Sequence, residues 1–311
     1  MIHVPADELW KFAIEQMLFP CVEFFLPTLF AEVDTEQGFS FLEQELHALD
    51  PDSRSRTRRT DKLVSVALKS GEECWILIHI EVQGYQDENF PRRMYEYFYR
   101  AEDKYKRRIT ALAIFTDDAP NYFPNQYDAA FFGTRIVYRY NAYKVLSQYE
   151  EDLLAMANPF ALVVAAARMS IIKSNDEQRF AFKKRVVEMM LERKYKREII
   201  RALFKFVDIA VRIQKEEVNA NFTVFLKTTL PKKAMIDFNQ FLGQSELAML
   251  EQYVIEGEKR GEKRGEKRGE KNAQHRTAEN LLRRGDSIED VAEITMLSLK
   301  EVRVLAKRIA Q

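Results

Sequence analysis

Residues 61–83 read DKLVSVALKSGEECWILIHIEVQ and contain the strongest strand pattern of the chain. Its two apolar runs, 61–68 and 75–83, are rich in β-branched and aromatic residues, which are typical of strands. The segment between them, 69–73, is polar and contains a glycine, as hairpin turns do. The sequence therefore predicts two adjacent antiparallel strands.

Helices and strands alternate around this hairpin. Residues 5–30 carry apolar side chains at helical spacing, and Pro20 and Pro27 are expected to kink or divide that helix. Residues 39–48 fit a strand or a helix equally. The other elements predicted nearby are a helix at 90–105 and strands at 109–116 and 134–140. Together they predict an α/β domain with a mixed sheet at residues 1–143.

The rest of the chain has helical periodicity, which predicts an all-α domain at 144–255. Beyond it, residues 257–271 repeat GEKR without an apolar face, so 256–271 is expected to be a charged spacer. A small trihelical piece is predicted at 272–311. The helices predicted in the all-α domain are 144–156, 158–173, 177–192, 195–213 and 232–254.

The terminal piece has two interpretations. Lys300, Arg303 and Lys307 would line the reading helix of a helix-turn-helix. Acidic residues in the preceding helix, such as Glu289 and Asp290, would repel phosphates, which favours an oligomerisation module instead. The sequence leaves both interpretations open, and with them the question of a homo-oligomer.

The charge of the chain is unevenly distributed. Its 311 residues include 48 basic and 48 acidic ones, so the net charge is zero. Residues 1–50 hold 10 acids and 1 base, whereas residues 51–110 hold 10 acids and 13 bases, so the neutral total does not exclude a DNA partner. The 2 cysteines make no disulfide framework, and no stretch is long and apolar enough to span a membrane, so we expect a cytoplasmic protein.

Polar residues at the strand ends form a candidate metal site. Alternation along 75–83 places His79, Glu81 and Gln83 on one face, and Asp61 begins the neighbouring strand. Two carboxylates at adjacent strand ends can share Mg²⁺ or Mn²⁺, and a polar group beyond them can orient the attacking water. Spacing alone fits solvent-facing acids as well, and His79 fits a structural role as well as a place in the site.

Several segments resemble a known family. They are TDKLVSVALKSGEECWILIHIEVQG, ENFPRRMYEYFYRAEDKY, ITALAIFTDD, FFLPTLF, FLEQELHAL, NPFALVVAA and LERKYKREIIRALFKFVD. Over most of residues 5–255 the chain is similar to the Rpn (recombination-promoting nuclease) or transposase branch of the PD-(D/E)XK nuclease superfamily. The resemblance implies a restriction-endonuclease-like αβββαβ core that cleaves DNA with Mg²⁺, in DNA recombination.

The resemblance also implies roles for individual residues. Asp61 and Glu81 would hold the metal together with the Val82 carbonyl, and Glu45 would be an additional acid. Gln83 takes the place of the superfamily's lysine, and a neutral amide cannot supply that positive charge. The departure favours an alternative, in which a weak or inactive nuclease fold serves as a DNA-binding or self-associating scaffold.

Basic residues near the candidate site are expected to contact DNA phosphates. The arginine loop before Asp61 fits equally a solvated basic segment that balances the acidic N-terminal region. The residues predicted to bind DNA are Arg54, Arg56, Arg58, Arg59, Lys62, Arg92 and Arg93.

Overall fold

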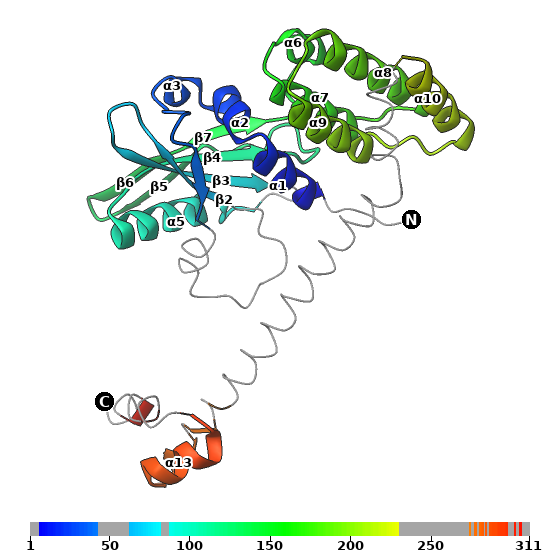
Figure 1. Cartoon of the computed structure of the whole chain (residues 1–311). Coiled ribbons are helices and arrows are strands. Elements are labelled where there is room, and N and C mark those ends of the chain that lie inside the picture. Colours follow the sequence, from blue (N-terminus) through cyan, green and yellow to red (C-terminus); the bar gives the residue numbers. More distant parts are fainter. Residues whose placement is uncertain are drawn as a thin grey trace. The chain divides into compact units, whose positions relative to one another are not determined.

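The chain divides into two compact units, Met1–Ile236 and Asp237–Gln311. The computed structural model of the protein describes residues 6–42, 62–81, 87–229 and 286–297, together with isolated positions between 274 and 306 (Figure 1). The charged spacer at 256–271 and the helix predicted at 232–254 lie outside the described residues.

A mixed five-stranded sheet lies at the centre of the first unit, in the order β1-β2-β3-β4-β7. β2 is antiparallel to β1 and to β3, whereas β4 is parallel to β3 and to β7. The predicted hairpin is confirmed as β2 and β3, and the prediction of an α/β fold with a mixed sheet is confirmed with it. The strands are β1 (Phe39–Phe41), β2 (Lys62–Ala67), β3 (Glu73–Glu81), β4 (Arg108–Phe115) and β7 (Asn141–Lys144).

Helix α5 (Phe90–Tyr105) connects the parallel strands β3 and β4 and has the bounds that the sequence predicts. Pro91 lies in its first turn, where no backbone donor is needed, and Lys106 ends it in the left-handed conformation, with φ of 52°. Its buried residues pack on one face of the sheet, against Trp75 and Leu77.

The opposite face packs against helices from both halves of the unit. Trp10 lies 6.2 Å from Phe160 and 5.8 Å from Phe206 between ring centroids, so one core joins the N-terminal helix to the later helices. Ile76 and Ile78 of β3 belong to the same core. The helices of this core are α1 (Ala6–Gln16), α2 (Leu18–Phe25), α3 (Pro27–Phe30), α6 (Glu150–Ala155), α7 (Phe160–Ile171), α8 (Asp176–Glu192) and α9 (Arg197–Ala210). α10 (Glu216–Thr229) packs against α8.

The N-terminal helix is divided at two positions. The break at Leu26 precedes Pro27, which begins α3, as predicted. The other break was expected at Pro20 but falls at Met17. Pro20 instead lies in the first turn of α2, where its missing N–H removes no intrahelical bond.

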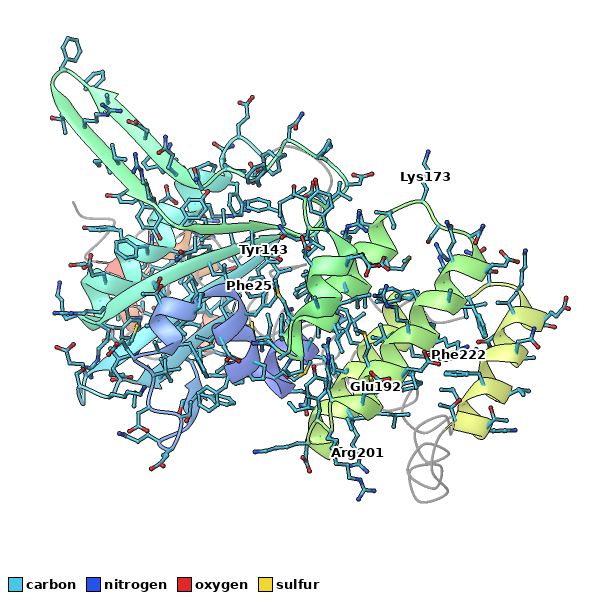
Figure 2. All side chains as sticks on the ribbon, turned by 90° about the horizontal axis from the view of Figure 1, so that it is seen from above. Phe25, Tyr143, Lys173, Glu192, Arg201 and Phe222 are labelled. Carbon is cyan, nitrogen blue, oxygen red and sulfur yellow. The ribbon has the colours of Figure 1, made fainter. Side chains whose placement is uncertain are left out.

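Two strands form a separate ribbon, β5 (Gln126–Phe131) and β6 (Thr134–Arg139), which projects from the body of the unit (Figure 2). The predicted strand at 134–140 is therefore present, but it lies outside the central sheet. Its two-residue turn is Phe132–Gly133, with φ of 42° and 86°, as in a type I′ turn. Phe132 is 93% exposed at this tip.

In the second unit, the described residues include helix α13 (Ile288–Thr295). The Ser287 hydroxyl accepts a 3.1 Å hydrogen bond from the Asp290 N–H and so caps the N-terminus of this helix. Val291, Leu297 and Val302 belong to a small buried cluster.

Candidate active site

The ends of three parallel strands meet at one edge of the central sheet. Glu81, the last residue of β3, pairs with Phe115 at the end of β4, and Phe115 pairs with Lys144 at the end of β7. β2 is antiparallel to β3 and begins at the same edge, where Lys62 pairs with Ile78. This edge, formed at Glu81, Phe115, Lys144 and Lys62, is called the carboxyl edge below. In α/β proteins such edges are the usual place for ligands.

Of the predicted site residues, the structure places Lys62, Arg92, Arg93 and the backbone of Glu81. The approach of Asp61, Glu81 and Gln83 to one another therefore stays a prediction. The predicted residues that lie outside the described ranges are Glu45, Arg54, Arg56, Arg58, Arg59, Asp61, Val82 and Gln83.

Lys62 is a buried lysine with an acidic partner. Its Nζ lies 2.5 Å from Glu15 Oε1 of α1 and 5.3 Å from the centroid of the Phe41 ring. The ammonium charge is thus compensated within the protein. A part for Lys62 in DNA binding stays a prediction, and it would require this charge to be shared with Glu15.

The two predicted arginines of α5 differ in their surroundings. Arg93 Nη1 lies 2.7 Å from Asp87 Oδ2, and its guanidinium carbon lies 5.4 Å from the centroid of the Phe90 ring. Arg92 is exposed and pairs with Glu96, with 3.0 Å between Nε and Oε1. An exposed pair of this kind contributes little to stability, so a DNA phosphate can compete for Arg92 more easily than for Arg93.

A buried ion pair at the carboxyl edge was not singled out from the sequence. Lys144 Nζ lies 2.6 Å from Asp117 Oδ1, and the two side chains are 1% and 0% exposed. The Ala119 N–H also donates to Asp117 Oδ1, at 2.9 Å. Asp117 Oδ2 is buried without a hydrogen-bond partner in the described part of the chain. The sequence signal was the pair of acids that follows the apolar run at 109–116.

Aromatic side chains make the surroundings of this edge apolar. His79 is buried with its ring 4.9 Å from that of Phe90, which fits the structural interpretation of this histidine. The Phe90 ring also lies 5.2 Å from Phe115 and 6.1 Å from Tyr140. Burial raises the pKa of the Tyr140 hydroxyl well above its ordinary value, so this group stays neutral at physiological pH.

The loop after β4 contacts the chain that follows β3. The Tyr122 hydroxyl donates to the Asp87 carbonyl at 2.9 Å and accepts from the Asp87 N–H at 3.2 Å. The Tyr122 ring packs edge-on against Phe115, with 5.7 Å between centroids. The loop after β4 is thereby connected to the segment that directly precedes α5.

Among the described residues, no group of three or more histidine, cysteine, aspartate or glutamate side chains is arranged to hold a metal ion. Two of the predicted ligands, Asp61 and the Val82 carbonyl, lie outside those residues. The described helices also include none that is long and apolar enough to cross a membrane. No protein-family model, curated protein or solved structure gives a significant match to the chain.

Proposed function

We propose that this protein is a metal-dependent DNA endonuclease of the Rpn type, which hydrolyses phosphodiester bonds with Mg²⁺ or Mn²⁺ in DNA recombination. The observation that carries the proposal is the position of Glu81 at the carboxyl edge. β2 begins at the same edge directly after Asp61, because Lys62 is its first residue and pairs with Ile78. Asp61 itself lies outside the described residues, and the approach of its carboxylate to Glu81 is part of the proposal.

The order of elements supports the same proposal. Among the described elements, α1, α2 and α3 precede the antiparallel strands β1, β2 and β3, and α5 and β4 follow them. This order is compatible with the αβββαβ core that the resemblance implies. α5 covers the face that includes Trp75 and Leu77, and its first turn lies close to the carboxyl edge through Phe90 and Phe115.

In the proposed mechanism, each residue of the edge has one task. Asp61 and Glu81 would supply carboxylate oxygens and Val82 a carbonyl oxygen to the metal, which is the ligand type that Mg²⁺ prefers. The bound metal would stabilise charge on the phosphate and activate water. Gln83 would orient the attacking water through its amide, and Arg92 would hold a neighbouring phosphate.

The proposal is tested by nicking of supercoiled DNA with purified full-length protein. We expect activity with Mg²⁺ or Mn²⁺ and a loss of at least about a hundredfold in Asp61→Ala and Glu81→Ala. Glu188→Ala is the matched control, because this exposed carboxylate on α8 pairs only loosely with Lys184, at 3.9 Å. Equal activity in all variants would show that the metal site is wrongly assigned.

The alternative function is a scaffold that binds other copies of itself. The observation that favours it, besides Gln83, is the tip of the β5–β6 ribbon, where Phe131 and Phe132 are exposed. Arg135, near this tip, pairs with Asp128, so the tip suits a neutral apolar contact better than DNA. Concentration-dependent sedimentation without metal-dependent nicking would favour the scaffold.

A cytoplasmic location is part of the same proposal. The two cysteines, Cys21 and Cys74, are buried free thiols. Unpaired cysteines are common in the reducing cytosol and less so in oxidising compartments.

A further inference from the structure

Tyr122 makes two hydrogen bonds to the backbone of a single residue. Its hydroxyl donates to the Asp87 carbonyl at 2.9 Å and accepts from the Asp87 N–H at 3.2 Å. A tyrosine hydroxyl has one proton to donate, and that proton is used here. The side chain of one loop thus holds both backbone polar groups of another, so it constrains the position and the direction of the chain at Asp87.

The side chain of Asp87 is held as well. Its Oδ1 accepts a 2.9 Å hydrogen bond from the Asn89 N–H, and its Oδ2 accepts one of 2.7 Å from Arg93. The Phe90 N–H donates to the Asp87 carbonyl at 3.0 Å. Asp87 is therefore fixed to the first turn of α5 on one side and to Tyr122 on the other.

Tyr122 is held in place by contacts with β4 and with the loop that follows it. Its ring contacts Phe115, the last residue of β4, and its N–H donates to the Ala119 carbonyl at 3.4 Å. The Ala119 N–H donates to Asp117, which the buried Lys144 holds at 2.6 Å. A fully buried ion pair of this geometry resists rearrangement, because separating its charges in a dry environment is costly.

We propose that Tyr122 is a positioning residue for the catalytic end of β3. Glu81 is fixed at its backbone by the ladder to β4, and Asp87, six positions later, is fixed by Tyr122. The residues that hold Glu81 and Asp87 both belong to β4 or to the loop after it. The inference rests on the proposed nuclease function, since it assigns Glu81 and Gln83 their roles.

Tyr122→Phe is the variant that tests this role. It keeps the ring contact with Phe115 and removes both hydrogen bonds to Asp87. Small displacements of catalytic groups cost a large share of the rate, so we expect kcat for Mg²⁺-dependent nicking to fall at least about tenfold, with KM for DNA unchanged. Tyr149→Phe is the control, because Tyr149 is exposed before α6, and it should match the unsubstituted protein.

Hydrogen exchange of the backbone amides measures the two hydrogen bonds between Tyr122 and Asp87 independently of nuclease activity. In Tyr122→Phe the Asp87 amide should exchange about tenfold faster, which is the effect of losing about one hydrogen bond, while the amides of β4 keep their protection. Unchanged exchange at Asp87 would show that these two hydrogen bonds do not hold its backbone. Faster exchange with an unchanged kcat, or a change in KM alone, would overturn the positioning role.

The two proposals fail in different ways. Absence of metal-dependent nicking by the unsubstituted protein would overturn the nuclease function and the positioning role with it. Nicking that is lost in Glu81→Ala but equal in Tyr122→Phe and the unsubstituted protein would leave the nuclease function standing and overturn only the role of Tyr122.

Discussion

Lys62 and Lys144 both lie at the carboxyl edge, and each pairs with an acid at almost the same distance, 2.5 Å to Glu15 and 2.6 Å to Asp117. They belong to opposite faces of the sheet. In the strand register, Lys62 lies opposite Ile78, whose side chain packs against the N-terminal helices. Lys144 lies opposite Phe115, whose side chain packs against α5. The candidate acid Glu81 ends a strand between them.

The two pairs differ in their access to water. Glu15 is 26% exposed, whereas Asp117 is 0% exposed. The interaction between two charges strengthens as the effective dielectric constant falls, but so does the cost of removing each charge from water. A short distance therefore does not by itself determine how much an ion pair contributes to the free energy of unfolding. Removing one partner of each pair measures the difference between them.

The largest effect is expected for Lys144→Met. This substitution keeps the side-chain stem and leaves Asp117 as an uncompensated buried charge. Breaking a buried pair in this way costs about 3–5 kcal/mol, so urea unfolding should show a loss of that size in the free energy of unfolding. A loss below about 1 kcal/mol would mean that water reaches Asp117 in the folded protein.

A double variant separates the unpaired charge from the lost contact. Lys144→Met combined with Asp117→Asn removes both charges and keeps an oxygen that can accept from the Ala119 N–H. We expect it to recover most of the stability lost in Lys144→Met, because replacement of a whole buried pair is often nearly neutral.

A smaller effect is expected for Lys62→Met. Glu15 can turn towards water when its partner is removed, so the cost should be about 1 kcal/mol. High salt should weaken the Lys62–Glu15 pair and leave the Lys144–Asp117 pair almost unchanged, since ions screen only accessible charges. The measurement is the loss of unfolding free energy in Lys62→Met and in Lys144→Met, relative to the unsubstituted protein, at low and at high salt. An equal change of the two losses with salt would contradict this contrast.

The same two lysines show what the sequence could and could not reveal about the site. Lys62 was noticed because it follows Asp61, and its partner Glu15 is 47 positions earlier in the chain. No local pattern connects the two. Lys144 and Asp117 are 27 positions apart, and the ladder between β4 and β7 that brings them together was not predicted. Pairs formed by tertiary structure have no periodic signal of their own.

The elements of the fold divide in a similar way. The β2–β3 hairpin and α5 were predicted because long runs with strand or helix periodicity specify them locally. β7 was missed because its sequence, NAYK, is too short to show alternation, and the helix predicted at 144–156 begins only at Glu150. β5 and α10 were missed as well. The break at Met17 has no proline or glycine to mark it, so the sequence pointed to Pro20 instead.

Glu73 lies at the opposite edge of the sheet, where β3 begins. The smallest effect on stability is expected for the hydrogen bonds of its carboxylate. Its Oε1 accepts hydrogen bonds from Ser65 Oγ at 2.5 Å and Trp75 Nε1 at 2.8 Å. The bond from Ser65, followed by that from Trp75, lowers the pKa of the Glu73 carboxyl below its ordinary value. A carboxyl whose pKa is lower in the folded state contributes stability above its unfolded-state pKa and loses it as the pH falls through the folded-state pKa.

Ser65→Ala should therefore lower the free energy of unfolding at about pH 7, by about 0.5 kcal/mol, because the 38% exposed Glu73 side chain is well screened by water. At about pH 3, below the ordinary pKa of a glutamate, the difference from the unsubstituted protein should shrink, since the carboxyl is then largely protonated in the unfolded state. Urea unfolding at both pH values measures this. If Ser65→Ala lost the same unfolding free energy at both pH values, the serine would be acting through its packing in β2. The charge of Glu73 would then make no measurable contribution to stability.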